Sequence, residues 1–315
     1  MSQPEPRHTE HRITVRAAAA DVYRLIAEVQ NWPALFPPTV HAEVVERGGR
    51  EERIRIWATA NGQIKNWTSR RYLDQAALRI DFRQEVSSPP VAAMGGSWII
   101  EPLTGSECAV RLLHDYRAVD DDPAGLDWID QAVDRNSGSE LSALKAGAEL
   151  AANAADRSLT FEDSVRVRGG AKDLYDFVNE AQLWDERLPH VAAVRLTEDT
   201  PGIQTLRMDT QAVDGSVHTT ESVRVCFPYD RIVYKQTTLP ALLALHTGSW
   251  HFQDDGTGGA TAVSRHTVVI ETENISRVLG PDAGLTEARA FVRDALGTNS
   301  RTTLGHALSY AEKRR

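Results

Sequence analysis

The feature that most constrains this chain of 315 residues is an internal repeat. Asp173 follows Asp21 by 152 residues, and the same spacing recurs far downstream. The pairs that share it are Asp21/Asp173, Tyr23/Tyr175, Trp32/Trp184, Pro37/Pro189, Glu46/Glu198, Arg79/Arg231, Gln84/Gln236, Trp98/Trp250 and His114/His266. A constant spacing over so many positions is typical of a duplicated domain. We therefore predict two copies of one fold, in residues 1–155 and 156–315.

The spacing changes before the last helix of each copy. Asn136 and Ser137 correspond to Asn299 and Ser300, which follow them by 163 residues. The second copy is therefore expected to carry an insertion just before its last helix. The join between the copies is predicted near residues 152–158, where a polar helix end is followed by the opening strand of the second copy.

Hydrophobic periodicity predicts the same order of elements in both copies. The first begins with a short strand at residues 13–15 and an amphipathic helix over residues 18–29. Six strands follow, at residues 39–47, 51–59, 62–72, 77–86, 94–102 and 107–118. Asn61-Gly62 is the strongest hairpin signal among the turns between them. A long helix over residues 126–153 closes the first copy, and one over residues 285–313 closes the second.

These elements predict an α+β protein made of two tandem helix-grip domains. A curved antiparallel sheet wrapped around a long C-terminal helix buries both the apolar face of the sheet and the apolar stripe of the helix. Such a sheet cannot close tightly at both ends. We therefore expect each domain to contain an interior pocket.

Composition excludes several classes of function. There are 35 Lys and Arg against 44 Asp and Glu, and no dense basic run, so nucleic acid is not an expected partner. Cys108 and Cys226 fit no disulfide or metal pattern, which predicts a reducing, cytoplasmic location and no metal site. His8 and His11 lie in a polar segment expected to be disordered and are not interpreted as metal ligands. No apolar run is long enough for a membrane span or a secretory signal.

Strand alternation identifies the residues expected to line the first pocket. Trp67, Ser69 and Arg71 share one face of their strand. Asn136 is the polar member of an apolar helix stripe, and a buried amide needs a partner or a ligand. The other expected lining residues are Met94 and Trp98 on one strand, His114 and Tyr116 on another, and Trp32 after the first helix.

Each of these residues also has a purely structural interpretation. Arg71 could pair with a carboxylate at the sheet edge, and His114 could be an ordinary core histidine. Trp32 and its counterpart Trp184 could pack in the core without contacting a ligand. Met94 could fill a gap, and Asn136 could bond within its own helix. Four basic residues on one hairpin, Arg50, Arg53, Lys65 and Arg70, form either a solvated face or a docking site for an acidic carrier protein.

Four segments of the first copy resemble the aromatase/cyclases of bacterial type II polyketide synthases. They are Trp32–Glu43, Trp67–Arg71, Met94–Trp98 and Arg135–Ser137. The resemblance covers the whole chain, because that family includes didomain members with two fused helix-grip folds of the START/Bet v1 type. It implies Arg71 as the catalytic residue, and a pocket formed with Trp32, Trp67, Met94, Trp98 and Asn136. Strand alternation adds His114 and Tyr116 to the pocket, and the shared strand face together with the resemblance makes Ser69 a second catalytic candidate.

The second copy departs from this pattern in the sequence. At the 152-residue spacing, Trp67, Ser69 and Arg71 correspond to Thr219, Glu221 and Val223, so the second copy is expected to lack the guanidinium. A possible second pocket, with a holding role or a later step, would use Trp184, His218, Trp250, His266 and Asn299. Chemistry is therefore expected in the first copy.

The resemblance implies an enzyme that acts on a poly-β-ketone held by acyl carrier protein and reduced at carbon 9. It would close the first ring between carbons 7 and 12 and promote the dehydration that makes the ring aromatic. Expected partners are the carrier protein and, with it, a ketoreductase and the minimal synthase. Acidic methylenes allow aldol addition without a metal or redox cofactor. The alternative is a non-catalytic module that binds or transports a hydrophobic small molecule, because one fold serves both purposes.

We expect three polar groups to share the chemistry. The Arg71 guanidinium would stabilise a developing enolate or alkoxide as a fixed charge. Ser69, or a water it holds, would relay the proton that dehydration needs, and Asn136 would orient a substrate carbonyl. The test of this prediction is whether the Arg71 side chain lies inside the domain or in bulk solvent.

Overall fold

The computed structural model describes residues 5–149, 156–211 and 217–314. The chain divides into two compact units, unit 1 (residues 1–154) and unit 2 (residues 155–315). The predicted join near residues 152–158, and the predicted helix end at Asn153, lie largely outside the described residues. No helix in the described ranges is long and apolar enough to span a membrane.

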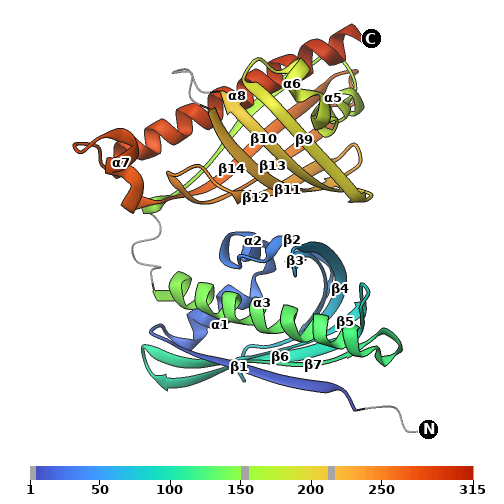
Figure 1. The fold of residues 1–315 in the computed structure, drawn as a ribbon, viewed down its shortest axis with the longest axis vertical. Helices are drawn as coiled ribbons and strands as arrows, with labels where there is room; N and C mark the ends of the chain where they lie inside the picture. Colours follow the sequence, from blue (N-terminus) through green and yellow to red (C-terminus); the bar gives the residue numbers. More distant parts are fainter. Residues whose placement is uncertain (1–4, 150–155, 212–216, 315) are drawn as a thin grey trace. The chain divides into compact units, whose positions relative to one another are not determined.

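Unit 1 is a seven-stranded antiparallel sheet wrapped around one long helix (Figure 1). Its strands are β1 (Arg7–Val15), β2 (Thr39–Gly48), β3 (Glu51–Ala60), β4 (Gln63–Asp74), β5 (Arg79–Val86), β6 (Val91–Thr104) and β7 (Glu107–Ala118). Its helices are α1 (Ala19–Ala27), η1 (Val29–Asn31), α2 (Trp32–Leu35), η2 (Val119–Asp121) and α3 (Pro123–Glu149). The strand order is β1-β7-β6-β5-β4-β3-β2, so the first strand joins the last and the predicted α+β helix-grip fold is confirmed.

Local sequence explains the first helix and the β3–β4 hairpin of unit 1. Val22, Tyr23 and Ile26 form the buried stripe of α1, as expected for an amphipathic helix. The predicted Asn61-Gly62 hairpin is confirmed, since both residues have positive φ (49° and 76°) between the paired ends of β3 and β4. Asparagine and glycine tolerate this left-handed backbone, which matches the twist of the strands.

The N-terminal segment differs from the prediction. We expected disorder around His8 and His11, but Arg7 already begins β1, which pairs with β7 along its whole length. His11 lies on the inner face of β1, and its ring nitrogen contacts Asp134 of α3 at 3.1 Å. Pairing with β7 satisfies backbone groups that a polar side-chain pattern alone does not reveal.

Unit 2 repeats this architecture with the strand order β8-β14-β13-β12-β11-β10-β9 (Figure 1). Its strands are β8 (Ser158–Val167), β9 (Val191–Thr200), β10 (Ile203–Gln211), β11 (Val217–Phe227), β12 (Arg231–Thr238), β13 (Leu243–Asp254) and β14 (Ala260–Ile270). Its helices are α5 (Ala171–Asn179), η3 (Ala181–Leu183), α6 (Trp184–Arg187), η4 (Thr272–Asn274), α7 (Ile275–Leu279) and α8 (Leu285–Lys313). The predicted insertion before the last helix is confirmed: η4 follows β14 as η2 follows β7, and the additional residues lie between η4 and α8 and include α7.

In each unit the apolar core is divided into two clusters along the long helix. In unit 1, Leu141 and Leu144 of α3 belong to one cluster, while Ile129 and Val133 belong to the other. In unit 2, Leu304 of α8 belongs to one cluster and Val292 to the other. The helix turns between the two clusters carry polar residues that face the sheet. This division, which both units share, creates a polar band inside each domain.

Candidate functional site

The polar band of unit 1 contains several of the predicted site residues. On β7, His114 lies between Tyr116 of one apolar cluster and Leu112 of the other. On α3, Asn136 and Glu140 lie on the turns between the two clusters. Strand pairing places His114 in one row with three other inward-facing positions, Gly96, Phe82 and Arg71.

Arg71 lies inside unit 1, as the sequence predicted, and has protein partners. Its side chain is 2% exposed, and its Nε donates a hydrogen bond of 3.0 Å to Oε1 of the equally buried Glu52. Nη2 also contacts Glu52, and Nη1 and Nη2 donate to the carbonyl oxygens of Ile26 and Ala27 at 3.1 and 2.6 Å. The guanidinium lies 5.2 Å from the centre of the Trp32 ring. Arg71 therefore joins the end of α1 to β3 and β4.

The charge of Arg71 is compensated inside the protein. Burial lowers the pKa of its guanidinium, and the neighbouring Glu52 carboxylate opposes that shift. Because an arginine side chain starts from a pKa above 12, Arg71 stays charged at neutral pH. The pairing with Glu52 weakens the field that Arg71 exerts on its surroundings.

The other predicted residues of unit 1 fall into packed and accessible groups. Ser69 is 3% exposed and faces the interior beside Arg71, while Trp67 keeps part of its surface accessible. Trp32 and Trp98 are core residues: Trp32 donates to the Ile26 carbonyl at 3.1 Å, and both rings contact Phe36. The purely packing interpretation of Trp32 therefore has direct structural support, and Trp98, which was expected to line the pocket, packs in the same core cluster.

Three further predicted residues are held by neighbours. Tyr116 is 1% exposed, and its hydroxyl donates to Asp130 at 2.5 Å. Met94 is partly accessible, and its sulfur accepts a 3.5 Å hydrogen bond from Gln84. Asn136 uses its amide to donate to the Thr59 carbonyl at 3.0 Å, so it ties α3 to the end of β3. The Asn136 amide oxygen accepts no hydrogen bond within the described part of the chain.

Glu140 is a site residue that the sequence reasoning missed. It lies one turn after Asn136 on α3, keeps part of its surface accessible, and its surroundings raise its pKa to about 8 by desolvation. Desolvation also lowers the pKa of His114 to about 4, and the Nδ1 atom of His114 is buried without a partner in the described part of the chain. At neutral pH a protonated acid and an uncharged imidazole therefore lie in the same polar band. The sequence did contain a signal for Glu140: it follows Asn136 by four residues, which places both side chains on the same face of the helix.

One end of unit 1 is open where the β3–β4 turn meets α3. A hollow of about 610 Å³ is lined there by Asn61, Gly62, Trp128, Gln131 and Arg135. Arg135 donates to the Asn61 side chain, whose amide in turn donates to the Trp128 carbonyl at 2.8 Å. The hollow therefore lies beside the helix turn that precedes Asn136.

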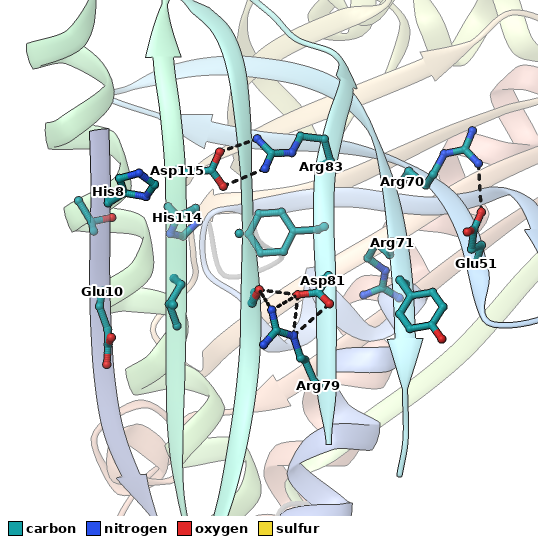
Figure 2. Close-up of a pocket in the computed structure, with 16 residues that line it drawn as sticks. His8, Glu10, Glu51, Arg70, Arg71, Arg79, Asp81, Arg83, His114 and Asp115 are labelled. Carbon is teal, nitrogen blue, oxygen red and sulfur yellow. Dashed lines mark hydrogen bonds and ion pairs between the residues drawn. The ribbon is translucent and has the colours of Figure 1, made fainter. Parts of the chain in front are cut away.

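A second hollow, of about 730 Å³, crosses the outer face of the same sheet (Figure 2). Its side chains form ion pairs with one another, including Arg83 with Asp115 at 2.5 Å and Arg79 with Asp81 at 2.7 Å. Arg83 crosses Gly95, where an added Cβ would collide with the guanidinium. The paired charges neutralise each other. Arg71 and His114 are also among the residues that line this hollow, while Ser69 is not.

The basic hairpin has a similar explanation. Arg70 pairs with Glu51 and Glu85, at 3.2 and 2.9 Å, and Arg53 pairs with Glu85 at 2.6 Å. Arg50 lies 3.8 Å from Asp74. Lys65 instead donates to the Pro89 carbonyl at 3.0 Å and lies 5.6 Å from the Trp128 ring, at the edge of the open end. The arginines thus form the solvated face that the sequence allowed.

The prediction that unit 2 lacks the guanidinium is wrong. Arg224 is paired with Tyr234 as Arg71 is with Phe82, and it faces Gln204 as Arg71 faces Glu52. The correspondence in this strand has a spacing of 153 residues, because Arg224 follows its partner Gln204 by 20 residues, whereas Arg71 follows its partner Glu52 by 19. The connection from β11 to β12 is one residue shorter than the connection from β4 to β5, which restores the spacing of 152. Because the two changes cancel, comparison of the two halves of the sequence did not reveal them.

Arg224 repeats the contacts of Arg71 with one difference. It is 2% exposed, donates to the Val178 carbonyl at 2.7 Å and lies 5.4 Å from the Trp184 ring. The position of Glu52 is taken by Gln204, which donates to Glu198 at 2.8 Å. Arg224 Nη1 and Gln204 Oε1 are both buried without a partner among the described residues. Burial lowers the pKa of Arg224, and Cys226, Tyr175 and the Glu198 carboxylate oppose that shift. The strand position directly paired with Arg224 holds Gln204, whereas the position paired with Arg71 holds Glu52.

The remaining predicted residues of unit 2 occupy different environments. Trp184 and Trp250 are buried in the core, and Trp184 donates to the Phe177 carbonyl at 3.3 Å. His266 is buried within a hydrogen-bonded cluster, and Asn299 lies on the adjacent turn of α8. His218 is exposed near the start of β11 and does not join these buried groups.

Comparison with known proteins agrees with this duplicated architecture. A family model described as polyketide cyclase/dehydrase and lipid transport matches residues 15–122 and again residues 170–291. The granaticin polyketide synthase bifunctional cyclase/dehydratase of Streptomyces virginiae is 51% identical over 94% of this chain and 97% of its own. The actinorhodin polyketide synthase bifunctional cyclase/dehydratase of Streptomyces coelicolor is 45% identical over 99% of both chains.

Two solved structures share the fold over nearly the whole chain. The di-domain ARO/CYC BexL of the BE-7585A pathway is 64% identical, with a TM-score of 0.87 over 97% of this chain and 99% of its own. The di-domain ARO/CYC StfQ of the steffimycin pathway is 35% identical, with a TM-score of 0.86 over the same shares. With one match to the family model in each unit, the chain belongs to the polyketide cyclase/dehydrase and lipid transport family as a two-domain member.

Proposed function

We propose that this protein is the aromatase/cyclase of a type II polyketide synthase and that the interior of unit 1 forms the first ring of the product. The substrate is a poly-β-ketone held on acyl carrier protein and reduced at carbon 9. Ring closure between carbons 7 and 12 is followed by loss of water. The observation that carries the proposal is the polar band of His114, Asn136 and Glu140 between two apolar clusters, with the buried Ser69 on the inner face of β4.

The arrangement suits a reaction that depends mainly on folding of the chain. Apolar walls hold a long flexible substrate, and a few polar groups fix the carbonyls that react. Holding two reacting carbons together can contribute roughly 7–11 kcal/mol to lowering the barrier. The methylenes between carbonyls are acidic, so aldol addition needs only a proton acceptor and a stabilised oxyanion.

Four side chains would manage the protons and the charge. Glu140, with its pKa raised to about 8, is protonated at neutral pH and can donate a proton to the departing hydroxyl. Ser69 relays the proton, and the free amide face of Asn136 orients a carbonyl. Arg71 adds a positive charge on the same strand face as Ser69. Its bonds to Glu52 and the α1 carbonyls hold it rigidly and reduce its net effect.

The carrier protein would approach the open end of unit 1. Lys65 and Arg135 lie at this end and form no ion pair in the described part of the chain. Two unneutralised cations suit an acidic carrier or the phosphate of its prosthetic arm. The arginines of the basic hairpin do not serve this purpose, because acidic neighbours neutralise them.

The test is reconstitution with a minimal synthase, its acyl carrier protein and a ketoreductase, with products separated by chromatography and mass spectrometry. The native protein should replace shunt products with a product whose first ring is aromatic. Ser69→Ala and Glu140→Gln should each lower that yield about 100-fold, the lower end of general acid–base effects. Ser106→Ala, an exposed serine of the β6–β7 turn, is the matched control and should change nothing.

The rival function, a container for a hydrophobic molecule, predicts a different result. A container would bind the reduced polyketide but leave the mixture of shunt products as it is without the protein. Near-native yields from both Ser69→Ala and Glu140→Gln, with the fold intact by circular dichroism, would also refute the assignment of these residues.

A further inference from the structure

Unit 2 contains a buried hydrogen-bonded cluster of side chains that its packing does not require. His246 Nε2 and His266 Nδ1 lie 2.9 Å apart, and the Tyr234 hydroxyl lies 3.4 and 3.0 Å from these same two atoms. On the other side of its ring, His266 Nε2 contacts Ser300 at 2.6 Å and Ser264 at 3.2 Å. The cluster lies in the polar band between the two apolar clusters of unit 2.

The same positions in unit 1 are mostly apolar. Strand pairing aligns Tyr234 with Phe82, His246 with Met94 and Ser264 with Leu112, while His266 and Ser300 correspond to His114 and Ser137. Unit 1 shows that this fold packs well with phenylalanine, methionine and leucine at the three positions. In unit 2 all three carry polar groups that contact the same histidine, so the cluster is not a requirement of the fold.

One atom of the cluster is left without a partner. His246 is 2% exposed, yet its Nδ1 is buried and makes no hydrogen bond in the described part of the chain. A purely structural polar network normally satisfies all of its buried atoms, because an unpaired one costs roughly 1–3 kcal/mol. An unsatisfied nitrogen at the edge of a satisfied cluster is therefore the atom that a ligand would contact.

A positive charge lies in the same row of the sheet. Arg224 is paired directly with Tyr234 across β11 and β12, and both face the interior. Gln204 replaces the carboxylate that neutralises the equivalent arginine of unit 1, and Arg224 Nη1 lacks a hydrogen-bond partner among the described residues. Burial lowers the pKa of Arg224, and Glu198, the carboxylate that opposes this shift, contacts Gln204 instead of the guanidinium. An enolate that forms beside Tyr234 would find a cation without a directly paired carboxylate and a hydroxyl donor close together.

We propose that unit 2 carries a second acid–base site, formed by His246, Tyr234 and His266 with Arg224, that removes a molecule of water from a cyclised β-hydroxy ketone. The class of substrate for this site follows from the proposed function, on which the inference rests. A ring closed by aldol addition carries a new hydroxyl at carbon 7 and, in a reduced polyketide, a second hydroxyl at carbon 9. Such a ring loses two molecules of water to become aromatic, so the two units can divide the two losses.

The proposed step balances without any further reactant. His246 Nδ1 takes a proton from the carbon between the carbonyl and the carbon that bears the hydroxyl. The C–H electrons form the new carbon–carbon double bond as the C–O bond breaks. The Tyr234 hydroxyl gives its proton to the departing oxygen, which leaves as water, and it recovers a proton from His246 Nε2. Burial lowers the pKa of both His246 and His266, so the proton is passed on rather than kept on an imidazolium.

The experiment removes one oxygen atom from the cluster. Tyr234→Phe places in unit 2 the residue that unit 1 has at that position, so the fold is expected to stay intact. His246→Met is the second such variant. Both are assayed in the full chain with the minimal synthase, carrier protein and ketoreductase, and products that retain one hydroxyl of the first ring are quantified against fully aromatic product. Tyr229→Phe, an exposed tyrosine of the same unit, is the matched control.

The proposal expects the ratio of singly dehydrated to aromatic product to rise at least tenfold in Tyr234→Phe and His246→Met, with total cyclised product unchanged. An unchanged ratio in both variants would overturn it. A parallel fall of both products would also overturn it, because that result indicates a structural role. Failure of the proposed function is separately visible, since the native protein would then leave the mixture of shunt products unchanged.

Discussion

Units 1 and 2 use the same buried arginine in different electrostatic surroundings. In unit 1, Arg71 is paired with Glu52, so the charge and its counter-charge are both supplied by the domain. In unit 2, Gln204 stands in place of the carboxylate, and Arg224 keeps its position with the Val178 carbonyl and the Trp184 ring. A duplicated fold can thus keep the position of a charged group while changing whether that charge is available to a ligand.

The interiors of the two units also differ in the polarity of the side chains around the shared histidine. Around the shared histidine, unit 1 has a phenylalanine, a methionine and a leucine, whereas unit 2 has a tyrosine, a histidine and a serine. Unit 1 instead has Glu140 on its long helix, where unit 2 has Thr303, which bonds within α8. Each unit therefore has titratable groups in its polar band, on different elements.

The largest expected effect tests the role of Glu52. Glu52→Gln gives unit 1 the arrangement of unit 2 and leaves Arg71 without its carboxylate, which should lower the free energy of unfolding of unit 1 by about 3–5 kcal/mol. Hydrogen exchange separates the two units, and denaturant unfolding gives the magnitude. The reverse change, Gln204→Glu, should stabilise unit 2. A loss below about 1 kcal/mol in Glu52→Gln would show that other groups neutralise Arg71.

The next effect concerns the glycine that each unit has in the cross-strand row of its buried arginine and its shared histidine. A Cβ at Gly96 would collide with the Leu113 carbonyl and the Phe82 ring, and one at Gly248 would collide with the Arg265 carbonyl and Tyr234. Gly96→Ala and Gly248→Ala should therefore each cost about 1–3 kcal/mol, the usual range for overpacking. Thermal unfolding measures both. A large loss in one unit and none in the other would break the structural equivalence of the rows.

The third prediction is a pH dependence of unit 1 that originates at Glu140. The pKa of Glu140 is raised to about 8 in the folded protein, so its contribution to stability is complete below its ordinary pKa and is lost as the pH rises through 8. Glu140→Gln should remove this loss and stabilise unit 1 by roughly 1–3 kcal/mol at pH 8 to 9. At pH 4 the variant and the native protein should be equally stable. Parallel stability curves for the two proteins between pH 5 and 9 would contradict the buried, protonated state.

The smallest effect compares the two tryptophans after the first helix of each unit. Trp32 and Trp184 both donate from the indole to a helix carbonyl, at 3.1 and 3.3 Å. Trp32→Phe and Trp184→Phe should each cost about 1 kcal/mol for the lost hydrogen bond, with a further small loss of packing. Equal losses by denaturant unfolding would support a shared structural role. A much larger loss of product yield than of stability in Trp32→Phe would instead indicate contact with substrate.

Sequence alone determined the duplication, the order of strands and helices and the inward face of the strand that carries Ser69 and Arg71. These features depend on local periodicity, turn chemistry and constant spacing, which are all present in the chain itself. Alternation placed Ser69 and Arg71 on the inner face, where the structure has them. The Asn61-Gly62 turn and the insertion before α8 were likewise readable, because positive φ and chain length leave direct traces in sequence.

Tertiary structure alone decided which inward-facing groups have partners. The pairing of Arg71 with Glu52 joins residues of two strands and the end of a helix, and no spacing rule reveals it. The identity of Arg224 as its counterpart depended on strand register, since two compensating one-residue changes in the connections conceal it in sequence. The raised pKa of Glu140 and the histidine cluster of unit 2 arise from desolvation and proximity. These properties belong to the packed interior, because they depend on distances between residues that are far apart along the chain.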